Sequence, residues 1–497
     1  MPRYRPVPAH PDHSALEHAI LRLWDERRTF ARLVEQNRGG QTFSFVDGPI
    51  TANNSMGVHH AWGRTLKDLF QRYQAGHGKE LRYQNGFDCQ GLWVEVEVEK
   101  SPGLNSKREI EEYGLDRFMR ACRERVAEYS AVQTEQSRRL GQWMDWERSY
   151  FTMTDPNIAY IWRFLQICDE RGWLYTGHRP MVWCPRCGTS LSEHELKATD
   201  SYRDVTHTSI YATLPLADAE DEHLAVWTTT PWTLPANVAA AVHPEAEYAA
   251  VRDGARLVWV MAARVEVVFG PEAEVVRRTP GSALVGRPYR GPFDDLPAVA
   301  EAAAAHRVIA WDAVGADEGT GIVHIAPGAG AEDFELGRRD GLPVLVPVGE
   351  AGAFGEGYGE LVGRTTAEVP ELVAAHLAAR GSLLRTEEYH HSYPHCWRCA
   401  TELIFRVVDE WFISADGVRE QMIAASREVQ WVPEHYGKRM EDWLRNMGDW
   451  CISRKRYWGL PLPFYLAPSG KVTVVGSLAE LRERALEPEL VDALPEL

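Results

Sequence analysis

The stretch TFSFVDGPITANNSMGVHHAWGRTLKD, residues 42–68, decides the fold class of this chain. Residues 42–47 are a short run typical of a β-strand, and residues 48–57 are rich in turn formers. A helical stretch follows over about 60–76. A strand, a glycine-bearing loop and a helix in this order open a nucleotide-binding α/β sheet. The stretch therefore predicts a Rossmann-like α/β domain.

The sequence on either side of this stretch is mainly of helical type. Residues 14–36 carry apolar residues at helical spacing and predict one amphipathic helix, and residues 105–180 are rich in helix formers. Between them, residues 94–98 alternate valine and glutamate. This alternation predicts a half-buried strand, although a helix with an acidic face also fits it.

From about residue 190 to 395 short β-like runs replace the helical pattern. They are separated by Gly, Pro and Asp turns and interrupted by one Ala-rich helix over 297–306; the runs are TSIYATL, LAVWTTT, YAAVRD, ARLVWVMAA, GTGIVHIA and LPVLVPV. Helical sequence returns after 400. We therefore expect a mainly β domain (184–399) inserted into an incomplete Rossmann-like domain formed by 1–183 and 400–497.

Four of the eight cysteines form two CxxC pairs, one at each joint of the inserted domain. They are Cys184, Cys187, Cys396 and Cys399. Four thiolates in two such pairs suit tetrahedral zinc and leave no open position for catalysis. The pattern predicts a structural zinc that clamps the insertion; four buried thiols without metal are the alternative.

Composition excludes several classes of protein. The chain has 497 residues, of which 44% are hydrophobic and 25% charged, as in ordinary globular proteins. Lys and Arg number 54 against 71 Asp and Glu, a net charge of −17, so a general nucleic-acid coat is excluded. No apolar run is long enough to span a membrane and no secretory signal is visible, so we expect a cytoplasmic protein without a membrane partner.

Four further segments carry polar groups suited to ligands, each with a plainer structural alternative. GVHHAWGRTLKD (57–68) places two histidines at a helix start, where they either face a bound anion or simply cap the helix. DWCISRKRYWG (449–459) offers three cations beside two aromatic rings, which either contact phosphates or form a solvated turn. WTTTPWTLPAN (227–237) offers hydroxyls for a polar ligand or simply an edge strand. GTGIVHIAPGAGAEDF (319–334) presents Asp333 from a loop, for an ammonium group or as a surface turn.

Taken together and in this order, the five motifs resemble the class I aminoacyl-tRNA synthetases of the isoleucyl, valyl and leucyl group, with the isoleucyl type closest. The resemblance covers essentially the whole chain. It implies a catalytic domain that activates the amino acid with ATP and charges tRNA. It also implies an inserted editing domain that hydrolyses wrongly charged tRNA, since one methylene discriminates by only about 1–3 kcal/mol.

In the catalytic domain, the resemblance assigns the binding of ATP, with Mg²⁺, and of the amino acid to six residues. They are Pro49, Gly57, His59, His60, Asp88 and Gln90. The HIGH motif of the family aligns with Gly57-Val58-His59-His60, a variant form of it. GFDCQG resembles the family's GWDCHG, which implies that Asp88 pairs with the amino acid's ammonium; Gln90 replaces a usual histidine and Trp93 a usual proline.

In the editing domain, the resemblance assigns the terminal adenosine and the aminoacyl ester to a threonine-rich strip. The strip contains Thr228, Thr229, Thr230 and Thr233. Asp333 aligns with the residue that anchors the ammonium, and His324 with the histidine that lines the side-chain pocket. Ala329 stands where histidine is frequent, and Glu332 where aspartate is frequent.

No KMSKS-like string occurs in the sequence. Because activation needs charge stabilisation on both sides of the triphosphate, we expect this chain alone not to complete it. Our first hypothesis is an enzyme that uses aminoacyl-tRNA, chiefly Ile-tRNA, and passes the acyl group to water or to a small-molecule amine, as in antibiotic biosynthesis. The alternatives are a ligase that needs a C-terminal synthetase half, and a non-catalytic tRNA-binding remnant.

Overall fold

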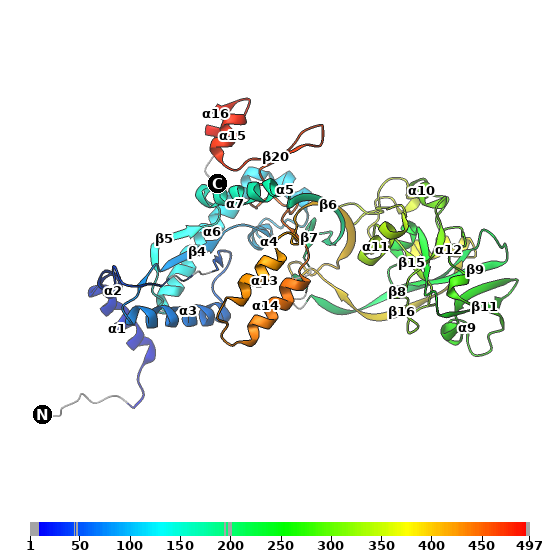
Figure 1. The fold of residues 1–497 in the computed structure, drawn as a ribbon, viewed down its shortest axis with the longest axis horizontal. Coiled ribbons are helices and arrows are strands. Elements are labelled where there is room, and N and C mark those ends of the chain that lie inside the picture. The colour runs from blue at the N-terminus through cyan, green and yellow to red at the C-terminus, as the bar shows by residue number, and fades with distance from the viewer. Residues whose placement is uncertain (1–8, 44, 46–47, 193–194, 197–200, 494–497) are drawn as a thin grey trace. The chain divides into compact units, whose positions relative to one another are not determined.

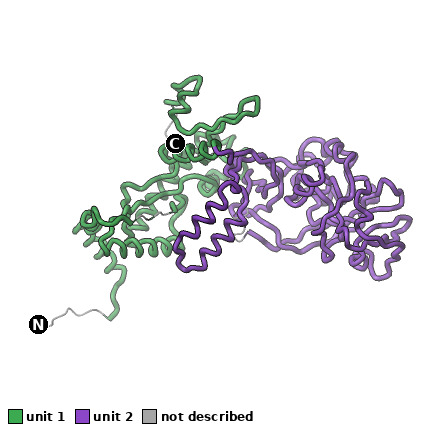
Figure 2. The backbone as a smooth tube through the Cα atoms, viewed as in Figure 1, with its two compact units in different colours: residues 1–170, 456–497 green, residues 171–455 purple. Residues whose placement is uncertain are grey.

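The computed structural model describes residues 9–43, 45, 48–192, 195–196 and 201–493. It divides into two compact units (Figure 2). The first unit contains Met1–Glu170 and Arg456–Leu497, and the second contains Arg171–Lys455. The domain limits at 183/184 and 399/400 stay a prediction. Within the described residues, no helix has both the length and the apolar character to cross a membrane.

The first unit contains a parallel three-stranded sheet, as the sequence predicts. Its strands lie in the order β2 (Ile50–Thr51), β4 (Gln84–Asp88) and β5 (Asp145–Phe151), and α3 (Val58–Gly76) follows β2. Figure 1 labels β4, β5 and α3. Parallel strands bring their carboxyl ends to the same edge, where ligands bind in open α/β sheets. An α/β class is confirmed for this unit.

Helices and two short strand pairs complete the first unit. Its core packs Phe87 of β4 against Val94, Phe118 and Val126 of the neighbouring helices. The other elements are α1 (His13–Glu26), α2 (Thr29–Gln36), β1 (Thr42–Phe43), β3 (Glu80–Leu81), α4 (Leu92–Lys100), α5 (Lys107–Tyr113), α6 (Leu115–Arg139), α7 (Asp155–Glu170), β19 (Phe464–Leu466), β20 (Val472–Val474), α15 (Leu478–Arg484) and α16 (Pro488–Asp492).

Three predictions for this unit need correction. Residues 14–36 form two helices because Arg28 adopts a left-handed backbone with φ 49°. The stretch 105–180 is not wholly helical, since β5 lies inside it and β6 begins at Leu174. Of the strand predicted over 42–47, only Thr42–Phe43 is seen as a strand, and residues 44, 46 and 47 lie outside the described residues.

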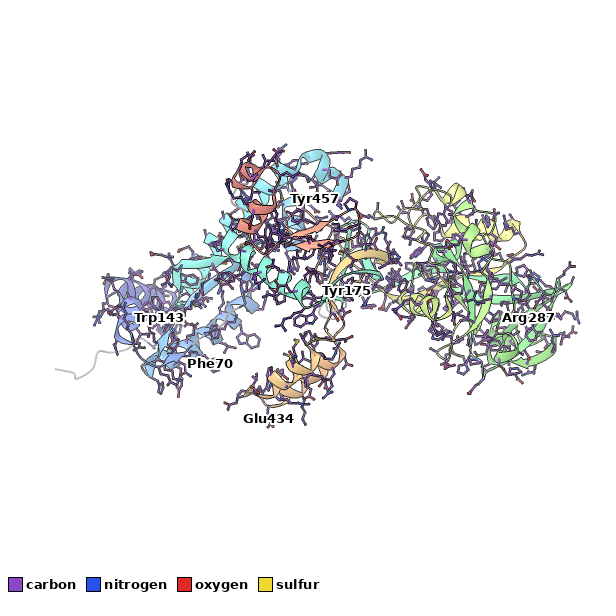
Figure 3. The ribbon with its side chains drawn as sticks, turned by 45° about the horizontal axis from the view of Figure 1, so that its top comes forward. Phe70, Trp143, Tyr175, Arg287, Glu434 and Tyr457 are labelled. Atoms are coloured by element: carbon purple, nitrogen blue, oxygen red, sulfur yellow. The ribbon has the colours of Figure 1, made fainter. Side chains whose placement is uncertain are left out.

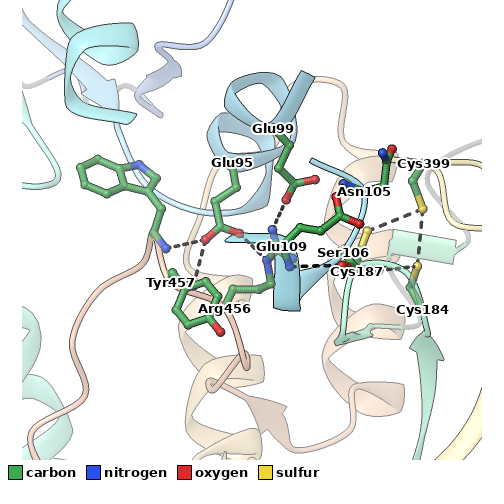
Figure 4. A network of polar contacts seen from close by, with 11 residues as sticks. Glu95, Glu99, Asn105, Ser106, Glu109, Cys184, Cys187, Cys399, Arg456 and Tyr457 are labelled. Atoms are coloured by element: carbon green, nitrogen blue, oxygen red, sulfur yellow. Dashed lines mark hydrogen bonds and ion pairs between the residues drawn. The ribbon is translucent and has the colours of Figure 1, made fainter. Parts of the chain in front are cut away.

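The alternating stretch 94–98 is helical, so the strand prediction was wrong and its helical alternative holds. The acidic side chains of α4 do not face solvent: Glu95 and Glu99 are buried and both bind Arg456 (Figure 4). Glu95 also accepts a hydrogen bond of 2.9 Å from the backbone N–H of Tyr457. A buried cation thus allows glutamates to occupy core positions, which hides the helical period of the sequence.

The basic segment 454–456, predicted as a phosphate-binding or solvated turn, is buried only at Arg456. Its other two cations also face carboxylates but stay partly exposed, so phosphate binding by them stays a prediction. Arg454 lies 3.8 Å from Glu195, Lys455 lies 3.1 Å from Glu350, and Arg456 is held as described above.

The second unit contains three sheets that lead from a paired stem into a β module, defined here as Tyr202–Pro394. The sheet orders are β18-β17-β6-β7 for the stem, and β13-β11-β12-β9-β8-β16 and β14-β10-β15 for the β module. The elements are β6 (Leu174–Cys184), β7 (Thr189–Leu191), β8 (Tyr202–Pro215), β9 (Glu222–Thr228), β10 (Ala239–Val242), β11 (Glu247–Asp253), β12 (Arg256–Met261), α9 (Val265–Phe269), β13 (Val275–Pro280), α10 (Ala300–Ala303), β14 (Arg307–Ala310), β15 (Val323–Ile325), α11 (Ala331–Asp340), α12 (Pro370–Ala379), β16 (Leu383–Pro394), β17 (Ile404–Ile413), α13 (Arg419–Arg427), α14 (His435–Asn446) and β18 (Trp450–Cys451).

The β module has one large apolar core built from both of its sheets. Small residues of β10, such as Ala240, pack with large ones such as Trp259 of β12. Two predictions fail here. LPVLVPV (342–348) forms no strand, since Pro343 and Pro347 lack the N–H that a ladder needs. The predicted helix over 297–306 shortens to a 3-10 turn and α10.

Candidate ligand pocket and metal cluster

A pocket of about 560 Å³ opens in the β module between the end of β9, the loop before β15 and the start of α11. It brings together all six residues that the sequence analysis assigned to the editing site, from positions more than 100 residues apart. They are Thr228, Thr229, Thr230, Thr233, His324 and Asp333. Asp317 and Glu318, which sequence reasoning missed, line the same pocket. Three carboxyl groups at one pocket favour a cationic group of a ligand.

Asp333 lies in the first turn of α11, and one of its carboxylate oxygens accepts the N–H of Ala326 at 2.8 Å. This bond fixes the side chain against the loop that follows β15. Burial raises the pKa of Asp333 to about 6. The group is therefore mainly ionised at pH 7 and is poorly solvated, a state that an ammonium ligand stabilises.

His324 presents a fixed, neutral ring at the pocket. Thr233 donates its hydroxyl to the carbonyl of Thr230 at 2.8 Å, so its oxygen accepts from Nε2 of His324 at 2.9 Å. Burial lowers the pKa of His324 to about 4. The ring stays uncharged at neutral pH, and Thr233 assigns the proton to Nε2.

The raised pKa of Asp333 predicts a gain in stability when its charge is removed. The ordinary pKa of an aspartate side chain is 3.8. Above about pH 6 the group is ionised in both states and its burial opposes folding, whereas below about pH 4 it is protonated in both states and has no effect. Asp333→Asn keeps the acceptor for Ala326. We expect it to raise the free energy of unfolding by about 1–3 kcal/mol at pH 8 and negligibly at pH 4. Urea denaturation at both pH values measures this, with the exposed Glu332→Gln as control; an equal effect at both pH values would contradict the assignment.

Glycines form one wall of the pocket. Gly319 has φ +56°, and a Cβ there would lie 2.6 Å from Cε3 of Trp227. Gly315, also on the wall, has open space around its Cα. We expect Gly319→Ala to weaken ligand binding about tenfold and to cost about 1–2 kcal/mol of stability, whereas Gly315→Ala changes little. Ligand titration and thermal denaturation of both variants check this, and equal behaviour of the two would refute it.

Of the residues predicted to bind ATP and the amino acid, Asp88 lies at the carboxyl edge of the β2-β4-β5 sheet. Asp88 ends β4, lies half-buried and accepts the hydroxyl of Thr51 at 3.1 Å; burial raises the pKa of Asp88. Gln133 of α6 donates to the carbonyls of Thr51 and Asn54 at 2.8 and 2.7 Å. Sequence reasoning missed this role of α6, because nothing in a helical period marks which polar residue faces a loop.

The histidine pair occupies the start of α3, with Gly57 as the residue before its first turn. Gly57 donates its N–H to Nδ1 of His60 at 3.1 Å, and the rings of His59 and His60 lie 3.9 Å apart. Burial and the neighbouring cations lower the pKa of His60. Pro49 directly precedes β2. Gln90 accepts the hydroxyl of Thr152 at 2.7 Å and donates to its carbonyl at 3.2 Å, so its amide already has partners at both ends.

The four cysteines of the two CxxC pairs come together at one end of the β6–β17 ribbon. Their sulfur atoms all lie within 4.8 Å of one another, and Sγ of Cys399 is 3.5 Å from that of Cys184 and 3.6 Å from that of Cys187 (Figure 4). A tetrahedral zinc with bonds of about 2.3 Å separates its sulfur ligands by about 3.8 Å. The cluster could therefore hold a metal ion.

Comparison with known proteins decides the family. Residues 19–493 match the family described as tRNA synthetases class I (I, L, M and V). The chain belongs to this family. It is 40% identical to the isoleucine–tRNA ligase of Methanopyrus kandleri over 96% of this chain and 46% of that protein. It is 41% identical to the isoleucine–tRNA ligase of Thermus thermophilus, over 96% of this chain and 46% of that protein.

This class I synthetase chain is thus of the isoleucyl-like type, as its motifs indicated, and it spans about half the length of the curated relatives it matches. Among solved structures, an Agrobacterium radiobacter LeuRS in a ternary complex with tRNA and LeuAMS matches 94% of this chain and 52% of that chain. The identity is 14% and the TM-score 0.37, too low to bear on the fold.

Proposed function

We propose that the pocket of the β module binds the aminoacylated 3′ end of a tRNA, chiefly Ile-tRNA or Val-tRNA, and releases the aminoacyl group from its ester. The observation that carries this proposal is the partly buried carboxylate of Asp333 in the same pocket as the threonine strip. The carboxylate matches an α-ammonium group, and the threonine hydroxyls match an esterified ribose. The family membership supplies the substrate class.

The residues of the pocket divide this task between them. Asp333 holds the ammonium, and the hydroxyls of Thr228 and Thr230 bind the ribose and the ester. His324 is neutral and fixed, so it shapes the space for the amino-acid side chain without adding charge. The acceptor of the acyl group is water or a small-molecule amine; attack on the ester carbon forms the new bond and releases the tRNA ribose hydroxyl, which takes up the proton of the nucleophile.

A direct assay tests this proposal and identifies the acceptor. Purified chain is mixed with Ile-tRNA or Val-tRNA carrying a radiolabelled amino acid, and loss of the ester is followed with and without an added amine. Free amino acid shows water as the acceptor, and a labelled amide shows the amine. Ester loss no faster than without protein would refute enzymatic turnover and leave a binding protein.

A second candidate function is the ATP-dependent activation of isoleucine in the first unit. Two observations favour it: Asp88 lies at the carboxyl edge of the β2-β4-β5 sheet, and the histidine pair lies at the start of α3. Helix starts bind phosphate, and ATP with Mg²⁺ would bring it there. We propose that this reaction needs the part of the ligases that the chain does not cover. ATP–pyrophosphate exchange with isoleucine by the chain alone would contradict that requirement.

We also propose that the metal of the cysteine cluster is zinc. Four thiolates give a closed, structural site. Its place at the end of the β6–β17 ribbon suits a clamp at the root of the β module.

A further inference from the structure

The carboxyl groups at the pocket of the β module have no cation of the protein opposite them. Among the described residues, Asp317, Glu318 and Asp333 form no ion pair, and no lysine or arginine lines the pocket. A carboxylate elsewhere in the module shows the contrast: Glu222 binds Nη1 of Arg287 at 2.7 Å, and Figure 3 labels this arginine. The protein therefore leaves the negative charge of the pocket without compensation.

A tRNA end alone does not supply the missing positive charge. An aminoacyl ester carries one ammonium group, which the proposed function assigns to Asp333, and the nucleotides attached to it carry phosphates. Asp317 and Glu318, which we call the acidic rim, then lie at the same pocket as an anionic substrate. Like charges in close contact oppose binding, so a second cation at the acidic rim would favour it.

The spacing of the three carboxyl groups favours ammonium groups over a metal ion. Among the described residues, the four cysteines are the only group of three or more His, Cys, Asp or Glu side chains close enough to hold one metal ion. The carboxyl groups of the pocket therefore do not converge on a single ion. Carboxylates set apart in one cavity match ammonium groups that are set apart as well.

The acidic rim is held in place beside two aromatic rings. The hydroxyl of Tyr389 donates to Oε1 of Glu318 at 3.4 Å, and the ring of Tyr389 meets that of Trp227 edge to face at 5.1 Å. Arg264 fixes the adjoining wall by donating Nε to the carbonyl of Gly319 at 3.0 Å. A carboxylate next to aromatic rings attracts an organic cation through both charge and ring quadrupole.

A second, independent observation indicates that the pocket is built for a ligand with hydrogen-bond donors. His324 lines the pocket and is only 8% exposed, and its Nδ1 has no hydrogen-bond partner among the described residues. Because the proton of the ring lies on Nε2, Nδ1 is an acceptor, and a buried acceptor without a partner costs free energy. An amine supplies such donors, whereas the apolar side chain of isoleucine or valine does not.

We propose that the acidic rim is a second cation subsite, and that the acceptor of the acyl group is a small molecule with two amino groups, of the aliphatic diamine class. One amino group stays protonated at the acidic rim, and the other is neutral and attacks the ester carbon. A bond forms between this nitrogen and the carbon, the bond from the carbon to the ribose oxygen breaks, and a proton of the attacking nitrogen passes to that oxygen. The inference rests on the proposed function and narrows its acceptor to one class.

Two amines of equal chain length test the inference. The chain receives radiolabelled Ile-tRNA with either 1,4-diaminobutane or butylamine, and labelled amide is measured after subtraction of the rate without protein. The diamine should give at least about tenfold more amide, since the ion pair and the ring contact each contribute. Asp317→Asn combined with Glu318→Gln should bring the two amines within about twofold of each other. Asp312→Asn is the matched control, because Asp312 is exposed in the same segment but does not line the pocket, and it should keep the preference.

Each other result overturns the inference. Equal use of the two amines by the wild-type chain excludes a second cation subsite, and a preference that survives the double substitution places it elsewhere. Ester loss to water with no amide from either amine excludes an amine acceptor but leaves the proposed function intact, whereas no ester loss at all refutes both.

Calorimetric titration of 1,4-diaminobutane into the chain without tRNA gives a readout that is independent of turnover. We expect binding by the wild-type chain and by Asp312→Asn, and weaker binding by the double variant. No binding by the wild-type chain, or equal binding by the double variant, would contradict the subsite. Circular dichroism establishes that the variants are folded.

Discussion

Asp333→Asn is expected to lower the rate of ester release at the pocket by roughly 100-fold, because an ammonium loses its buried counter-charge. The substitution keeps the shape of the side chain and the bond to the N–H of Ala326, so the pocket itself persists. Steady-state deacylation of Ile-tRNA and Val-tRNA measures the effect. The loss should appear mainly as a higher KM with little change in kcat. The ammonium does not react, so Asp333 binds it equally in the substrate and in the transition state.

The neighbouring Glu332→Gln is the matched control, because Glu332 is exposed in the same helical turn and does not line the pocket. It should retain nearly full activity. Because the pKa of Asp333 is about 6, activity of the wild-type chain should also fall as the pH drops below 6. Full activity of Asp333→Asn, or an unchanged rate at pH 5, would remove Asp333 from the site.

Cys396→Ser is expected to abolish metal binding and to cost several kcal/mol of stability. Structural zinc contributes about 10–16 kcal/mol of apparent binding free energy in zinc-finger peptides, and this binding free energy is coupled to folding. The cluster joins two segments far apart in the chain, so its loss frees the end of the β6–β17 ribbon at which it lies. Metal analysis of the purified chain should give one zinc per wild-type molecule and none in the variant.

The matched control is Cys451→Ser, which alters a buried cysteine of the same unit outside the cluster. It should keep its zinc and lose only about 1 kcal/mol. A wild-type chain without bound metal, or equal melting temperatures for the two variants, would show that the four cysteines act as plain buried thiols.

The parts of the fold that follow local rules could be predicted from sequence. The helix α3 and the strands β8, β9, β11, β12 and β15 of the β module follow from period and turn residues. The individual strands of the parallel sheet do not, since β2 lies in a stretch rich in turn formers and β5 in one rich in helix formers. The stretch 94–98 could not, because Glu95 and Glu99 are buried only through Arg456, more than 350 positions away. Local pattern does not contain such a partner.

The pocket, too, was only partly predictable from the sequence. Six of its residues could be predicted because each lies in a short sequence motif. Asp317 and Glu318 were missed because acidic loop residues look like ordinary solvated positions. In the basic segment 454–456, the sequence does not reveal the carboxylates of three separate segments that face its cations.

The most direct test of the central claim is calorimetric titration of the chain with a hydrolysis-resistant mimic of the tRNA end, an adenosine whose ribose carries isoleucine through an amide. The mimic should bind at one site per chain, with affinity lost in Asp333→Asn and kept in Glu332→Gln. Equal binding by the wild-type chain and Asp333→Asn, or no binding at all, would contradict the assignment of this pocket to aminoacyl-tRNA.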